Sequence, residues 1–183
     1  MLKGEKVILR PVKRSDLDYF IVWANDPEVM RYMGGYLPMT EMAGENDIED
    51  IPKQSNTEVA FIIEAVAEET CRSIGSIVLS KINHKDHCAT FAITIGEKDY
   101  WNKGYGTEAT RLIIRYGFEQ LNLHRISSFV FSFNERSIRM HLRAGFIEEG
   151  RRKESIYING TCHDSVMFGL LKKEWQAMVN TNK

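Results

Sequence analysis

Apolar and polar positions recur along the chain with two periods, which separate strands from helices. Five apolar runs rich in β-branched and aromatic residues predict strands. These runs cover residues 6–12, 57–66, 73–82, 89–96 and 125–133. Two further apolar runs within 155–171 flank Asn159-Gly160, a dipeptide that suits a type I′ turn because both central residues need positive φ. The sequence therefore predicts a mostly antiparallel set of strands that ends in a hairpin.

Helical spacing marks two segments near the start of the chain. One helical face gathers the apolar residues Leu17, Phe20, Ile21 and Ala24. We therefore expect a helix over 15–25, with Ser15 as its N-cap. Pro27 suits the first position of a second helix that runs to Met33.

Two more helices are predicted around the glycine-rich middle of the chain. A stripe from residue 107 onward contains Ala109, Leu112, Ile113 and Tyr116. Residues 134–146 form a short helix with Asn134 as N-cap. Gly145 is the expected left-handed residue at its end, and Phe146 then folds back on the last turn.

The pattern as a whole predicts an α+β fold in one domain over residues 1–183. A last helix over 172–178 closes the chain, and one strand–glycine loop–helix–strand unit interrupts the antiparallel strands. No internal repeat, low-complexity tract or linker divides the sequence.

Charge and cysteine content narrow the function classes. Lys+Arg 24 against Asp+Glu 25 gives a net charge of -1, which argues against a nucleic-acid binder. No stretch has the length of a membrane span, and the first residues lack the apolar core of a secretory signal. Cys71, Cys88 and Cys162 are odd in number and widely spaced, which is typical of a reduced, cytoplasmic protein.

The segment His84-Lys85-Asp86-His87-Cys88 offers candidate metal ligands. His84, His87 and Cys88 crowd into five residues without a second ligand pair elsewhere, which makes a poor zinc site. Asn and Asp at this place favour a polar turn between strands. We therefore expect a turn and no metal.

Gly104 and Gly106 stand between a strand and an amphipathic helix. Amides at a helix start have no intrahelical partner and carry partial positive charge, so they bind anions. Bare glycines let a phosphate approach them, although a tight connection without any ligand fits the same pattern. The loop lacks the Lys-Ser/Thr of a P-loop and the third glycine of a Rossmann fingerprint.

Four segments in order resemble the GNAT superfamily of N-acetyltransferases, and within it the RimJ/RimL branch of ribosomal-protein N-terminal acetyltransferases. The segments are the entrance over 7–33, the glycine loop and helix over 100–126, the cofactor-side helix over 134–150 and the closing hairpin over 157–175. The resemblance implies an acetyl-CoA-dependent enzyme with a splayed central sheet and flanking helices. It also implies an amine-bearing substrate and the homodimer that is common among such proteins. Charge and the lack of a membrane-length stretch, rather than the resemblance, predict no nucleic-acid or membrane partner.

The resemblance assigns roles to individual residues. It implies that the pyrophosphate of acetyl-CoA lies on the backbone of Asn102, Lys103, Gly104, Tyr105, Gly106 and Thr107. It implies that the pantetheine arm pairs with Ile93, Thr94 and Ile95 and hydrogen-bonds Asn134. Trp101 stands where members of this branch commonly carry it.

The implied chemistry is direct attack of a neutral amine on the thioester. Many relatives carry, at the position of Thr90, a Glu that acts as the general base, and this chain lacks that Glu. An α-amine is already roughly a quarter neutral near pH 7.4, whereas a lysine amine is only ~0.1% neutral. The missing Glu therefore favours α-amine acceptors, or else a base outside the motif such as Glu58, His87 or Glu154 acting through water.

Two residues of the cofactor-side helix are candidate acids for the leaving thiolate. Ser137 matches a hydroxyl of the branch near the thioester sulfur, and the alternative is that it only completes the helix cap. His141 stands where many relatives carry a Tyr that acts as the general acid. The alternative is that His141 only packs in the core and is hydrogen-bonded there.

The acceptor is the least determined feature of the sequence. We expect a protein N-terminal α-amine or a small primary amine. The acidic stretch over 41–50 is either a solvated helix face or an attractor for cations, and the latter favours a polyamine acetyltransferase. A non-catalytic acyl-CoA-binding module is the alternative from another class, because the strand Glu and the helix Tyr are both absent.

Overall fold

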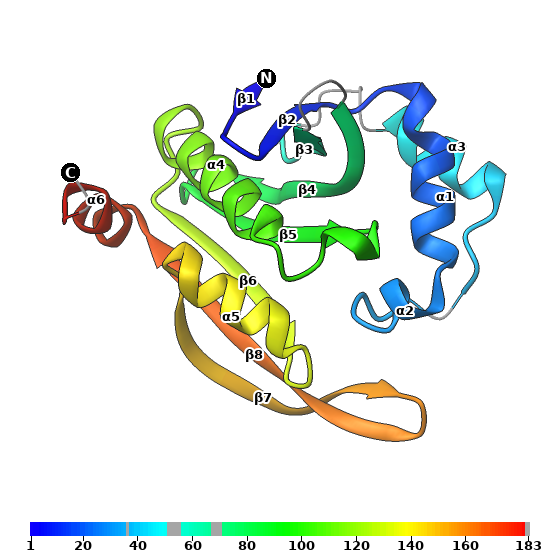
Figure 1. The fold of residues 1–183 in the computed structure, drawn as a ribbon. Helices are drawn as coiled ribbons and strands as arrows, with labels where there is room; N and C mark the ends of the chain where they lie inside the picture. Colours follow the sequence, from blue (N-terminus) through cyan, green and yellow to red (C-terminus); the bar gives the residue numbers. More distant parts are fainter. Residues whose placement is uncertain (36, 51–55, 67–70, 182–183) are drawn as a thin grey trace.

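The apolar runs of the sequence form a single sheet. The computed structural model describes residues 1–35, 37–50, 56–66 and 71–181, and only the backbone of 46–50. Within these residues the strands are β1 Leu2–Lys3, β2 Val7–Pro11, β3 Val59–Val66, β4 Cys71–Asn83, β5 Cys88–Ile95, β6 Arg125–Phe131, β7 Ile147–Ile158 and β8 Thr161–Leu171. They lie in the order β1-β2-β3-β4-β5-β6-β8-β7 (Figure 1).

The centre of the sheet splits between β5 and β6. These two strands pair in parallel, whereas the other neighbouring strands pair antiparallel. The parallel ladder joins Cys88–Thr90 to Arg125–Ser127 and ends there, although both strands continue. The predicted splay of the strands before and after the glycine-loop helix is therefore confirmed.

Six helices of the described residues flank this sheet. They are α1 Leu17–Asn25, α2 Pro27–Met30, α3 Glu41–Asp50, α4 Tyr105–Glu119, α5 Glu135–Ala144 and α6 Lys172–Thr181. Figure 1 shows α4 and α5 over one face of the sheet, with α1, α2 and α3 grouped beyond the carboxyl end of β5. The open part of β5 therefore faces α4, α5 and the segment that follows α2.

Helix α4 supplies much of the hydrophobic core. Ala109, Leu112 and Ile113 are buried, as their spacing predicts, whereas Tyr116 of the same stripe is half-buried. Ile114 and Phe118 extend the buried face beyond the stripe. They pack with apolar side chains of the sheet such as Phe91, so the helix start is held at a fixed place beside β5.

The predicted chain reversals form as expected. The side chain of Asn134 accepts a hydrogen bond from the Ser137 amide at 3.2 Å, which makes it the N-cap of α5. Gly145 has φ of 99°, and the Phe146 amide folds back to the His141 carbonyl. Asn159 and Gly160 both have positive φ, as a type I′ turn requires. Residues 84–87 form the polar turn, in which the Asn83 side chain accepts from the Lys85 amide.

The start of the first helix was predicted wrongly. Ser15 is not an N-cap, because residues 14–16 form a 3-10 turn and α1 begins at Leu17. Asp16 organises this turn instead: it accepts from the Lys13 amide at 2.7 Å and binds the guanidinium of Arg10 on β2. The Ser15 side chain makes no cap hydrogen bond to a described residue, because Asp16 takes the amide of Lys13 three residues before it and the guanidinium of Arg10 six residues before it.

Other boundaries also shift. Trp23, outside the predicted stripe, is the buried residue of α1, and its indole would contact a side chain at Gly96. Helix α2 ends at Met30 because the next residues turn, so the predicted helix to Met33 is too long. Strand β7 begins at Ile147, well before the predicted hairpin. The prediction missed its first half because β7 is an edge strand with exposed charged residues, which hide the alternation of apolar and polar positions.

Candidate active site

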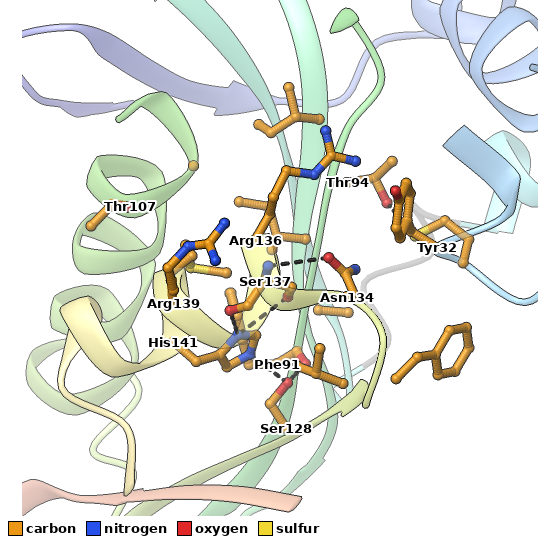
Figure 2. Close-up of a pocket in the computed structure, with 18 of the residues that line it drawn as sticks. Tyr32, Phe91, Thr94, Thr107, Ser128, Asn134, Arg136, Ser137, Arg139 and His141 are labelled. Atoms are coloured by element: carbon orange, nitrogen blue, oxygen red, sulfur yellow. Dashed lines mark hydrogen bonds between the residues drawn. The ribbon is translucent and has the colours of Figure 1, made fainter. Parts of the chain in front are cut away.

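A cavity of about 590 Å³ opens where β5 and β6 separate. Its walls come from both strands, from the start of α4, from one face of α5 and from Tyr32 and Met33 after α2. Figure 2 shows Tyr32 and Thr94 on one side of α5 and Thr107 on the other. The cavity therefore connects the glycine loop with the segment that follows α2.

Strand β5 presents backbone groups to this cavity. The carbonyl of Ile95 accepts from the Trp101 indole at 2.7 Å, so it points away from β4. Backbone groups alternate in direction along a strand, so those of Ile93 share this side, whereas the backbone of Thr94 turns toward β4. The free edge that an extended ligand can pair with therefore belongs to Ile93 and the amide of Ile95.

The two glycines of the loop are explained by different physical properties, backbone conformation at Gly104 and free space at Gly106. Gly104 precedes α4 with φ of 91°, a conformation that side chains rarely adopt. Gly106 lies inside the first turn, and a Cβ there would meet only the side chains of Ile93 and Ile95 at ordinary contact distance. The backbone turn therefore requires Gly104, whereas no described neighbour excludes a Cβ at Gly106.

The loop of α4 carries unpaired amides. No side chain of the described residues caps this helix. The first amides of a helix lack intrahelical partners, so those at the start of α4 are available to an anion. Asn102, Gly104, Gly106 and Thr107 line the cavity. Lys103 and Tyr105 do not line it: the carbonyl of Lys103 accepts from Lys6, and the ring of Tyr105 packs on Tyr100.

Ser137 lies on the cavity wall with its hydroxyl available. The backbone amide of Ser137 donates to the Asn134 side chain and completes the helix cap. The hydroxyl of Ser137 takes no part in the cap. Among the described residues, the hydroxyl has one long approach, 3.4 Å from Nδ1 of His141. The side-chain amide of Asn134 also lines the cavity, with its nitrogen not engaged by any described residue.

His141 joins three parts of the site. Its Nδ1 lies 2.8 Å from the Ser137 carbonyl and therefore donates to it, and its Nε2 lies 2.9 Å from the Ser128 hydroxyl. The same hydroxyl lies 3.1 Å from the Phe91 carbonyl, beside the point where β5 and β6 part. Figure 2 shows this chain of contacts from α5 to the sheet.

The environment of His141 keeps its imidazole neutral. Burial lowers its pKa to about 4, against the opposing effect of the Ser137 carbonyl, and only 2% of the residue is exposed. Its one proton is donated to that carbonyl, so none is aimed into the cavity. These contacts favour the packing alternative for His141 over a direct proton donor.

The general-base candidates outside the motif lie away from the cavity. Glu58, His87 and Glu154 are exposed, and none of them is among the lining residues. Thr90, where relatives carry a Glu, does line the cavity. The described lining contains cationic side chains but no Asp or Glu, which sequence reasoning did not anticipate.

The donor set fits acetyl-CoA. A free strand edge suits the amides of a pantetheine arm, and unpaired helix-start amides suit a diphosphate. The empty side of Gly106 leaves room for both beside Ile93 and Ile95. Fold and site together define an acyl-CoA-dependent transferase.

The chain belongs to the GNAT acetyltransferases. A family model described as an acetyltransferase (GNAT) domain matches residues 6–147. The chain is 30% identical to the spermidine N(1)-acetyltransferase of Escherichia coli (strain K12), over 97% of this chain and 92% of that protein. It is 37% identical to YdaF of Bacillus subtilis (strain 168), whose assignment as a ribosomal N-acetyltransferase is provisional, over 56% of this chain and 55% of that protein.

A solved structure shows the same fold with its ligands. The spermidine N-acetyltransferase of Vibrio cholerae, crystallised with CoA and spermine, superposes with a TM-score of 0.85 at 26% identity. The match covers 94% of this chain and 99% of that one. The protein is therefore a GNAT-fold N-acetyltransferase that uses acetyl-CoA. Relatives of both kinds match, so the RimJ/RimL branch stays a prediction.

No helix among the described residues is long and apolar enough to cross a membrane.

Proposed function

We propose that the protein transfers the acetyl group of acetyl-CoA directly to a protein N-terminal α-amine or a small primary amine. The observation that carries the proposal is the cavity between β5 and β6, which joins the cofactor edge to an outer wall at Tyr32 and Met33. Acetyl-CoA supplies an activated acetyl thioester, and the acceptor amine enters from the outer wall. The expected cytoplasmic location and homodimer belong to this proposal.

The cofactor contacts follow from the backbone geometry. The amides at Gly104, Gly106 and Thr107 hold the diphosphate, with Asn102 beside them. The edge groups of Ile93 and Ile95 pair with the pantetheine arm, and the side-chain amide of Asn134 donates to it. Thr94 contributes its side chain to the wall rather than its backbone. Lys103 adds positive charge at the loop without lining the cavity.

Proton handling falls to Ser137, with His141 in support. The hydroxyl of Ser137 is free to donate to the departing thiolate, and the proton that the amine nitrogen loses as the amide forms restores that hydroxyl. His141 fixes the first turn of α5 through the Ser137 carbonyl and holds Ser128 at the strand fork. It acts as a positioning residue, because its own proton is engaged.

The absence of a carboxylate base from the described wall favours α-amines. A primary α-amine supplies enough neutral form near pH 7.4 to react without deprotonation by the enzyme, whereas a lysine amine starts about 3 to 4 kcal/mol worse. The described wall offers no Asp or Glu to offset that difference.

A polyamine acetyltransferase is the second candidate, because spermidine acetyltransferases match the chain over nearly its full length. The acidic helix α3 is the feature that fits a polycation, and Glu41 on it is exposed. The side chains of 46–50 lie outside the described residues, so most of that stretch adds no structural argument. Membership in an enzyme family favours catalysis over the non-catalytic acyl-CoA-binding module.

The experiment is a thiol-release assay with the full chain, acetyl-CoA and a panel of amines. Turnover on peptide α-amines or small monoamines above that on spermidine supports the proposal. A kcat/KM for spermidine more than about tenfold above every monoamine supports the polyamine candidate instead. Binding of acetyl-CoA without turnover on any amine contradicts both.

A further inference from the structure

Arg136 places a cation on the outer side of the cavity. Its guanidinium carbon lies 3.8 Å from the ring centroid of Trp101 and 4.6 Å from that of Tyr32. These two rings stand edge to face, 88° apart, so they hold the guanidinium in the corner between them. The two rings thereby hold the planar faces of the guanidinium, while its N–H groups remain available as hydrogen-bond donors.

Among the described residues, no carboxylate pairs with Arg136. The ion pairs of α5 and its surroundings involve other arginines: Arg139 binds Glu135, and Arg151 binds Glu148. A half-buried guanidinium held by aromatic faces and without an acidic partner is a ready site for an anion, which can accept from its N–H edge in bidentate form.

The lysine and arginine side chains of the described wall carry the same positive charge. Lys81, Arg136, Arg139 and Arg143 line the cavity, and no Asp or Glu does so. Such a wall attracts anions and repels a second or third ammonium group. A polycation would therefore find no counter-charge on the described lining.

The arginines divide between two sides of α5. Figure 2 shows Arg139 on the side of Thr107 and the α4 start, and Arg136 on the side of Thr94 and Tyr32. Arg139 therefore faces the loop assigned to the diphosphate, whereas Arg136 faces the outer wall. This division separates a cation for the cofactor from a cation for the acceptor.

We propose that Arg136 binds a carboxylate of the acceptor, so that the substrate class is a primary amine that also carries a carboxylate. This inference rests on the proposed function and narrows its acceptor. Apolar walls at Met33, Phe129 and Phe131 suit an aromatic or aliphatic body between the two groups. The free amine then reaches the thioester while the carboxylate stays on Arg136.

The test uses acceptor pairs that differ in one carboxylate. The pairs are phenylalanine with phenethylamine, β-alanine with propylamine, and a peptide with glutamate after its N-terminal residue with its glutamine counterpart. Kinetics are measured on the full chain, on Arg136→Gln and on Arg136→Lys, with Arg115→Gln as the matched control. Arg115 is exposed on α4 and does not line the cavity.

We expect the carboxylate member of at least one pair to have a kcat/KM about 10- to 100-fold above its partner, the size of a charge-assisted hydrogen bond. Arg136→Gln should remove that preference and leave the KM for acetyl-CoA within about twofold, a range typical of a distant charge. Arg136→Lys should restore part of it, since the charge remains without the planar fork.

Equal rates within every pair overturn the inference, and so does a preference that survives Arg136→Gln. A raised KM for acetyl-CoA alone assigns Arg136 to the cofactor phosphates and also overturns it. If amines without a carboxylate are still acetylated, each of these results overturns only the inference and leaves the proposed function standing. Absence of turnover on every amine contradicts the proposed function and this inference together.

Discussion

The two sides of the cavity bind by different means. The inner side, made of the β5 edge and the start of α4, offers backbone amides and carbonyls. The outer side, made of Tyr32, Trp101 and Arg136, offers side chains from segments distant in sequence. A backbone surface can hold the same cofactor with many sequences, whereas a side-chain surface changes with each substitution. We therefore expect the fold to determine the cofactor and the individual chain to determine the acceptor.

A buried ion pair ties the start of α1, the helix that leads toward α2 and Tyr32, to the sheet, and breaking that pair should have the largest effect. Arg10 is 8% exposed and binds both oxygens of Asp16 at 2.7 Å, which ties the start of α1 to the sheet. Asp16→Asn removes the bidentate contact of Arg10 and leaves Glu64 as its remaining carboxylate partner, so it should lower the free energy of unfolding by about 3 kcal/mol, the low end for a broken buried pair. Denaturant unfolding measures it, with exposed Asp18→Asn as control. A loss below about 1 kcal/mol would show that the pair does not anchor α1.

The same pair gives a pH dependence. Burial opposes ionisation of Asp16, but hydrogen bonds from Arg10 and the Lys13 amide outweigh it, so its pKa is lowered. Its contribution to stability is present above the unfolded pKa of about 4 and is lost as pH falls through the folded value. Asp16→Asn should therefore differ most from the parent chain above pH 4 and approach it at lower pH.

His141 should make the strand fork acid-sensitive. Its pKa of about 4 in the folded state lies below the unfolded value of 6.5, so the unfolded chain binds more protons between these values. Stability is full above the unfolded value and falls by about 3 kcal/mol as pH drops toward the folded one. Unfolding of the parent chain and of His141→Phe at pH 7 and pH 4 tests this. Equal pH dependence in both would mean that His141 titrates normally and is not held neutral.

The inner side can be altered without disturbing the outer one. Gly106→Val adds a side chain whose Cβ meets no described neighbour closer than 3.7 Å, so we expect the fold to persist while the diphosphate and pantetheine lose their approach. We expect the Kd for acetyl-CoA to rise about 10- to 100-fold, the loss of a hydrogen bond to a charged group. Calorimetry measures it, with Ala177→Val on α6 as the control for valine in a helix. An unchanged Kd would place the cofactor elsewhere.

Gly104 sharpens this test. Its φ of 91° strains any side chain, so Gly104→Ala should lower stability as well as affinity. The contrast between the two glycines separates backbone conformation from ligand access.

Ser137 should give the smallest change. Removal of its hydroxyl in Ser137→Ala leaves the cap intact, because the Asn134 side chain binds the Ser137 amide rather than the hydroxyl. We expect kcat to fall about tenfold, at the low end for general acid catalysis, with an unchanged KM for acetyl-CoA. Ser132→Ala, outside the cavity, is the control. A normal kcat would leave Ser137 with a role in the helix alone.

Local patterns predicted the inner side of the cavity. The stripe of α4, the Asn134 cap and the glycine loop each depend on neighbouring residues, and the structure confirms the helices and the cap. The family resemblance, rather than a local pattern, assigned Ile93, Thr94 and Ile95 together to the pantetheine edge, because the direction of each backbone group depends on the pairing of β5 with β4.

Contacts across the chain set the outer side, and sequence reasoning missed them. Arg136 meets Trp101 and Tyr32 only after three segments fold together. The cap predicted at Ser15 was wrong for a different reason, because the competing contacts of Asp16 with Arg10 and Lys13 are local and helical spacing does not reveal them. Burial of His141 agrees with the packing alternative from the sequence, whereas its partners Phe91, Phe146 and Phe168 are identified only by the structure.

The most direct test of this division is a side-by-side kinetic measurement of Gly106→Val and Arg136→Gln. The first should raise the KM for acetyl-CoA and leave that for a carboxylate-bearing amine unchanged, and the second should do the reverse. Variants that each shift both constants to the same extent would contradict a cavity with separate cofactor and acceptor sides.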